Sequence, residues 1–111
     1  AASKDSEMAQ IWFEKAHLFA EQGRYNETVK ALEKAVLLEP EDKNLWINGG
    51  VLLSALLNRY DEALEYYERA LQIDPADGYA WYARGGALKA LGRNSEADAA
   101  FAKAKELGYE G

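Results

Sequence analysis

The chain has 111 residues, 49% of them hydrophobic, and its 19 acidic and 13 basic residues give a formal net charge of −6. This length and composition fit one modest domain with its own core, while the negative charge opposes binding to nucleic acid or to an anionic membrane surface. The lack of cysteine excludes disulfides and thiolate metal sites. No apolar run approaches the roughly 20 residues that span a bilayer, and the polar start AASKDSE is unlike a signal peptide, so we expect a soluble, cytoplasmic protein.

Six helices are predicted in chain order, at residues 6–22, 26–38, 43–57, 61–73, 78–91 and 95–107, and no segment alternates with the period of a strand. The first, third and fifth helices each carry a tryptophan within an apolar triplet. Trp12, Trp46 and Trp81 lie 34 and 35 residues apart. A small residue follows each tryptophan by four positions and a large apolar one by seven, on the same helical face, at Ala16, Gly50 and Gly85 and then at Phe19, Leu53 and Leu88.

The second, fourth and sixth helices carry a stripe with the same period. Its members are Thr28, Ala63 and Ala97, then Leu32, Tyr67 and Phe101, then Ala35, Ala70 and Ala104. We expect the small residues of the two helices in each copy to face each other, so that the helices approach closely. The helical register also assigns the tryptophans to packing rather than to a functional aromatic cage.

Short turns connect the helices. Each first helix ends at a residue suited to the left-handed conformation: Gly23, Asn58 and Gly92. The additional residue of the 35-residue interval is expected in the turn at Asn58. Pro40 and Pro75 end the second and fourth helices because proline has no N–H to continue the ladder, and Asp42 and Asp77 follow as N-caps.

This pattern resembles the tetratricopeptide repeat family over roughly residues 9–109. The resemblance implies an all-α, right-handed superhelical solenoid of three helix-turn-helix repeats. The expected boundaries are an N-terminal flank at 1–8, repeat 1 at 9–42, repeat 2 at 43–77 with the one-residue insertion, and repeat 3 at 78–111 without a separate capping helix. Thr28 and Leu32 depart from the family's alanine and aromatic, and Tyr109 stands in the proline position of the third copy, where the solenoid is expected to stop.

In this family the first helices line a concave surface that binds other proteins, so the resemblance implies a non-catalytic interaction module for a peptide or helix with apolar anchors. The predicted groove consists of Phe13, His17, Ile47, Asn48, Val51, Tyr79, Tyr82 and Ala83. Asn48 is expected to hold the backbone of the ligand in register. For the residues that follow each tryptophan, packing against the adjacent repeat is the alternative interpretation.

Related domains that bind the acidic tails of heat-shock chaperones use a clamp of lysine, arginine and asparagine. The corresponding positions of this chain are Phe13, His17, Asn48, Tyr79 and Ala83, and of these only Asn48 matches. Without the cations, the charge-assisted hydrogen bonds to a terminal carboxylate are lost. We therefore expect no binding of such tails.

A metal site, a cofactor site and a catalytic site are not expected. His17 is the only histidine, and Glu14 and Glu21 beside it would make a poor metal cage. The chain has no cysteine nucleophile and no glycine-rich phosphate loop, which argues against an enzyme.

The alternative to peptide binding is self-assembly. If repeat 3 ends the stack without a capping helix, its outer face stays uncovered, and homo-oligomers could form end to end there. The residues proposed for this contact are Ala100, Phe101 and Leu107.

Overall fold

The computed structural model describes residues 3–110 and contains six α-helices and one short π-helical segment, with no strand in that range. The elements are α1 (Lys4–Glu21), α2 (Tyr25–Leu38), α3 (Lys43–Val51), η1 (Leu52–Leu56), α4 (Tyr60–Ile73), α5 (Gly78–Ala90) and α6 (Asn94–Glu106). Residues 1, 2 and 111, at the edges of the predicted flank and of repeat 3, lie outside the described residues.

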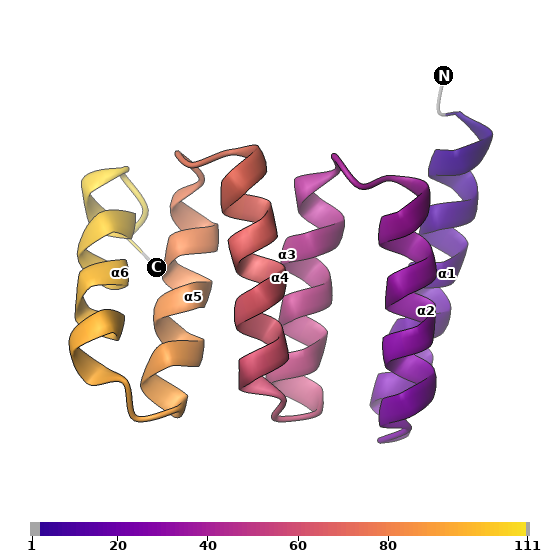
Figure 1. Ribbon diagram of the computed structural model, residues 1–111, viewed down its shortest axis with the longest axis horizontal. Coiled ribbons are helices and arrows are strands. Elements are labelled where there is room, and N and C mark those ends of the chain that lie inside the picture. Colours follow the sequence, from indigo (N-terminus) through magenta and orange to yellow (C-terminus); the bar gives the residue numbers. More distant parts are fainter. Residues whose placement is uncertain (1–2, 111) are drawn as a thin grey trace.

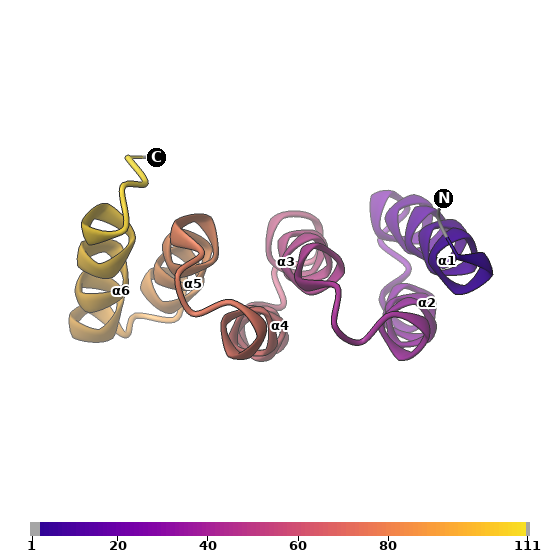
Figure 2. The same ribbon diagram turned by 90° about the horizontal axis from the view of Figure 1, so that it is seen from above.

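The helices form three consecutive antiparallel pairs, α1 with α2, α3 with α4 and α5 with α6, and α4 also packs closely on α5 (Figure 1). Seen from above, α1, α3 and α5 lie in one row, α2 and α4 lie in the other, and α6 stands beside α5 (Figure 2). The predicted all-α stack of three helix-turn-helix repeats is therefore confirmed.

The helix ends follow the predicted chemistry. Gly23, Asn58 and Gly92 have φ values of 71°, 55° and 79°, in the left-handed region. The carboxylates of Asp42 and Asp77 accept hydrogen bonds from the N–H groups of Asn44 and Ala80, each at 3.0 Å, and so cap α3 and α5.

The additional residue of repeat 2 is accommodated in a widened helical turn. In repeats 1 and 3 the arginine after the left-handed residue donates its N–H to a carbonyl five positions earlier, that of Phe19 or Leu88. In repeat 2 the N–H of Arg59 bonds the carbonyl of Leu53, six positions earlier, at 2.7 Å. Residues Leu52–Leu56 are π-helical, so the extra residue expected in the turn is taken up partly in the end of the first helix.

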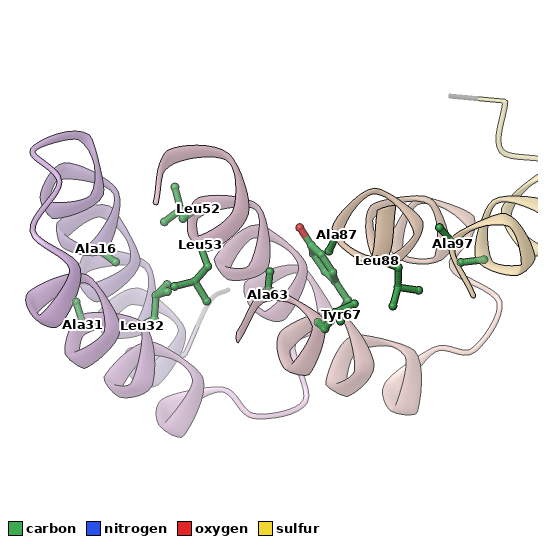
Figure 3. Packing of buried hydrophobic residues seen from close by; sticks show 12 residues of the cluster. Ala16, Ala31, Leu32, Leu52, Leu53, Ala63, Tyr67, Ala87, Leu88 and Ala97 are labelled. Carbon is green, nitrogen blue, oxygen red and sulfur yellow. The ribbon is translucent and has the colours of Figure 1, made fainter. Parts of the chain in front are cut away.

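The core runs along the stack between the rows of helices and contains the predicted stripes, including fully buried Leu32, Leu53, Tyr67 and Leu88 (Figure 3). A Cβ placed on Gly50 or Gly85 would overlap the ring of Tyr67 or Phe101. In repeats 2 and 3 a glycine of the first helix therefore lies directly against an aromatic ring of the second.

Candidate functional groove

A cleft of about 370 Å³ opens between α5 and the segment formed by the end of α3 and η1. Val51, Ser54 and Ala55 form one side, and the other side comes from α5. The α5 residues are Tyr79, Tyr82, Ala83, Gly86 and Ala87. This volume lies within the range of pockets that hold a small ligand or one side chain of a partner.

The floor of the cleft is Tyr67 of α4, whose ring is buried against Gly50 while its oxygen points towards Ala87 (Figure 3). The hydroxyl groups of Tyr67 and Ser54 are 3.2 Å apart and share a hydrogen bond. Burial raises the pKa of Tyr67 above its ordinary value. The phenol is therefore neutral at physiological pH and supplies a polar group at the base of an apolar cleft.

The rim of the cleft is aromatic and is extended by the C-terminal segment. The ring centroid of Tyr109 lies 5.7 Å from that of Tyr79 and 5.1 Å from that of Tyr82, and Tyr82 lies 5.4 Å from Phe101. Gly108, with a φ of 93°, turns the chain back towards α5. Gly78 permits the contact, since a Cβ there would lie 2.8 Å from Cβ of Tyr109.

Four of the eight predicted groove residues lie together in this cleft: Val51, Tyr79, Tyr82 and Ala83. Tyr79 and Tyr82 are each 40% exposed, which leaves aromatic surface for a ligand.

The other four predicted residues lie outside the cleft. His17 and Asn48 are exposed on α1 and α3, and Phe13 is half-buried against the core. The assignment of Ile47 to the groove is wrong: its side chain is 3% exposed and packs with Ala70, Leu71 and Ala80 in the joint between repeats 2 and 3. The alternative interpretation, packing against the adjacent repeat, holds for this residue.

Sequence reasoning missed the polar pair at the base of the cleft. Tyr67 was assigned to the core from its register, and that assignment is right for its ring. The corresponding positions of the other repeats are Leu32 and Phe101, neither of which has a hydroxyl. The available signal was the hydroxyl of Tyr67, which occurs at this position in one repeat only, together with the hydroxyl of Ser54 in the preceding helical segment.

The self-association residues also need correction. Ala100 is 3% exposed and belongs to the core, and Phe101 lies under Tyr82 and against Gly85. Leu107 is half-buried. These residues do not form an exposed patch on the outer face of α6.

Nε2 of His17 lies 3.3 Å from a carboxylate oxygen of Glu21, and both side chains are exposed. Between residues 3 and 110, no group of three or more acidic or histidine side chains is arranged to hold a metal ion. None of the helices in that range is both long and apolar enough to cross a bilayer.

The stacked hairpins define an α-solenoid domain with an aromatic cleft on one side. Two family models, both described as tetratricopeptide repeat, match residues 13–78 and 54–108. The first alone covers more than half of the chain. The chain belongs to the tetratricopeptide repeat family.

Solved structures with this fold include MamA AMB-1 and MamA MSR-1, at 28% and 27% identity, each with a TM-score of 0.75 over 89% of this chain. This chain spans 58% and 56% of the length of those two chains. The first tetratricopeptide domain of Spaghetti (RPAP3), solved with an HSP90 peptide, superposes with a TM-score of 0.77 over 93% of this chain and 81% of that one, at 24% identity. A search of curated protein sequences finds no significant match.

Proposed function

We propose that this domain is a non-catalytic interaction module that binds a peptide or short helix by an apolar anchor in the cleft between α3 and α5. The observation that carries the proposal is the cleft itself, in which Val51, Tyr79 and Tyr82 surround a floor made by Tyr67. Buried apolar or aromatic anchors supply most of the energy in such interfaces. Tetratricopeptide repeat domains generally act as protein-interaction scaffolds, which supports the coarser assignment.

The packing of Tyr109 supports an aromatic anchor in particular. Its ring rests against Tyr79 and Tyr82 in a tilted geometry, so these two side chains already accept an aromatic partner from within the chain. Asn48, exposed on α3, and His17, exposed on α1, would extend contacts along the ligand towards repeat 1.

We further propose that the groove does not bind acidic chaperone tails. Four of the five clamp positions hold Phe13, His17, Tyr79 and Ala83, which place no lysine or arginine in the groove. The imidazole of His17 is also engaged by Glu21. The HSP90 peptide SRMEEVD, seen with the RPAP3 domain, is the direct probe of this proposal.

The decisive experiment selects ligands from a random peptide library on the immobilised domain and compares the natural chain with Gly86→Leu. Gly86 lies in the cleft with no atom within 4 Å of a Cβ position, so leucine would fill the cleft without a clash at its first atom and would favour the helix. Ala102→Leu, on the exposed face of α6, is the matched control. We expect a shared aromatic or aliphatic motif that Gly86→Leu loses and Ala102→Leu retains.

Two results would contradict these proposals. Peptides that bind Gly86→Leu as well as the natural chain would move the site elsewhere. Binding of SRMEEVD with micromolar affinity would refute the exclusion of acidic tails.

A further inference from the structure

The two ends of the stack differ in the side chains that they present at equivalent positions. In α2 and α4, two aliphatic residues seven positions apart face the next repeat: Val29 and Val36, then Leu64 and Leu71. The equivalent positions of α6 are Asp98 and Lys105, both exposed. The outer face of repeat 3 therefore lacks the aliphatic pair with which repeats 1 and 2 hold their neighbours.

On the other side of each joint between repeats, the first helix of the next repeat contributes two buried apolar residues. Leu45 of α3 and Leu52 of η1, and Ala80 and Ala87 of α5, are buried in the core clusters. Leu45 clusters with Val36 of α2, and Ala80 clusters with Leu71 of α4. Each pair, again seven positions apart, is thus covered by the preceding repeat.

The same two positions of α1 are Ile11 and Leu18, which are 52% and 57% exposed. Their side chains are as large as those of Leu45 and Leu52 and larger than those of Ala80 and Ala87. Met8, one turn earlier on α1, is also exposed at 41%. The outer face of repeat 1 therefore presents the residues of an internal joint without a neighbour on them.

The face of α1 also carries a basic residue at the position that a basic residue holds in α5. Arg84 of α5 lies over the ring of Trp81 and reaches back across the joint to Glu68 of α4, with 2.9 Å between the charged atoms. Lys15 has the equivalent position in α1 and lies over the ring of Trp12, 4.7 Å from its centroid.

We propose that the face of α1 formed by Ile11, Lys15 and Leu18 is a docking surface for a helical hairpin of the kind formed by α3 and α4. In both internal joints, the helix that packs on the equivalent positions carries the same pattern. It has an aliphatic residue, a glutamate four positions later, and a second aliphatic residue three positions after the glutamate. Both α2 and α4 carry this pattern, as Val29, Glu33 and Val36 and as Leu64, Glu68 and Leu71. The surface is separate from the cleft between α3 and α5.

A second copy of the chain that stacks head to tail through α6 fits this face poorly. Head-to-tail stacking through α6 would set Asp98 against Leu18 and Lys105 against Ile11, in the register of the internal joints. Burial of a charge against an apolar side chain is costly. The occupant must therefore carry apolar residues that α6 does not have.

The test uses a four-repeat chain in which residues 43–77 are placed before residue 9, so that a copy of the α3–α4 hairpin precedes α1 in the register of the internal joints. Ile11→Glu with Leu18→Glu is introduced into this chain and into the natural one. Thermal unfolding is followed by circular dichroism. We expect the four-repeat chain to unfold in one transition at a higher temperature than the natural chain.

The double substitution should lower Tm by at least about 4 °C in the four-repeat chain and by less than about 2 °C in the natural chain, where both positions are exposed. Ile11→Ala with Leu18→Ala, which copies the residues of α5, should cost less than the glutamates. Amide hydrogen exchange of α1 supplies a second readout, since a docked hairpin slows it even if melting overlaps.

Equal losses of Tm in the two chains, or exchange in α1 that the added hairpin leaves unchanged, would overturn the proposal. Dimerisation of the natural chain that Ile11→Glu with Leu18→Glu abolishes would assign the face to a second copy instead, and would also overturn it. Light scattering over a concentration series makes that measurement.

Discussion

At the residue scale, neighbouring glycines in α5 have opposite roles. A Cβ on Gly85 would lie 2.7 Å from the ring of Phe101, whereas nothing lies within 4 Å of the corresponding point at Gly86. Gly85 is required by packing, because the aromatic ring of α6 occupies the space of its side chain. Gly86 leaves open the cleft that we assign to ligand binding.

This contrast predicts opposite effects of one substitution. Gly85→Ala should reduce the free energy of unfolding by about 1–3 kcal/mol, because overpacking displaces Phe101. Gly86→Ala should raise it by up to about 1 kcal/mol through helix propensity. Urea denaturation of the two variants measures both values, and a loss of stability in Gly86→Ala as large as that in Gly85→Ala would refute this interpretation.

The tryptophans act on the loops that precede their helices. The indole N–H groups of Trp46 and Trp81 donate to the carbonyl oxygens of Pro40 and Pro75, each at 2.9 Å. Each bond ties the start of a first helix to the loop after the preceding repeat. The equivalent partner of Trp12 would be Ser6, which is already inside α1.

Trp46→Phe removes this bond and keeps most of the ring. We expect a loss of about 0.5–1.5 kcal/mol in the free energy of unfolding, the usual net value of such a hydrogen bond. Trp12→Phe, where no such loop exists, is the control and should cost less. Equal losses in the two variants, measured by urea denaturation, would show that the hydrogen bond contributes nothing.

At the element scale, ion pairs tie the start of α3 to the loop that leads from α4 into α5. Lys43, at the start of α3, lies 2.5 Å from a carboxylate oxygen of Asp74 and 2.9 Å from one of Asp77, both in the loop between α4 and α5. The hydrogen bond from Lys43, followed by the N–H of Ala76, lowers the pKa of Asp74. The same carboxylates raise the pKa of Lys43, the hydrogen bond to Asp74 most.

These shifts predict a pH dependence with a definite sign. A carboxylate with a lowered pKa in the folded state stabilises the fold above its unfolded pKa of about 3.9, and this contribution is lost as the pH falls through the lower folded value. The raised pKa of Lys43 stabilises the fold below the unfolded lysine pKa of about 10.4. This stabilisation is lost as the pH rises through the higher pKa of the folded state.

Lys43→Gln should therefore lower Tm at pH 7 and have less effect at pH 3. Thermal melts of both chains at a series of pH values give this difference directly. Because the pair is partly exposed, added salt should also reduce it. A difference in Tm that stays constant from pH 7 to pH 3 would mean that the effect comes from packing of the lysine stem.

At the scale of the whole molecule, three repeats make a short stack. Its extents are 39 × 33 × 18 Å, and its radius of gyration of 13.9 Å is close to the roughly 13 Å of a globular chain of this length. Contacts nevertheless run mainly between neighbouring helices in sequence. Stability should therefore vary along the stack, as in other repeat proteins.

Leu32→Ala and Leu88→Ala test this variation, since both side chains are fully buried, one in repeat 1 and one in repeat 3. Each should cost about 2–5 kcal/mol in the free energy of unfolding. Hydrogen exchange should speed up most in α1 and α2 for Leu32→Ala and most in α5 and α6 for Leu88→Ala. A uniform acceleration along the chain would instead show all-or-none unfolding of the three repeats.

The sequence by itself determined the number of repeats, their register and their caps. These features are local, because they depend on side chains only a few residues apart. They comprise the helical period, the left-handed helix ends at Gly23, Asn58 and Gly92, and the capping aspartates. Four residues of the cleft were also predictable, since repeat register places Val51 and Tyr82 on the inner side of their helices.

Only the tertiary structure decided how the helix faces are shared between neighbours. Ile47 and Tyr82 hold equivalent positions, yet Ile47 is buried in a joint and Tyr82 is 40% exposed on the cleft. The π-helical end of repeat 2, the return of Tyr109 onto α5 and the hydroxyl of Tyr67 at the base of the cleft were not predictable either. These features depend on how one repeat packs on the next, because burial is a property of the assembled stack and not of a helix or its register.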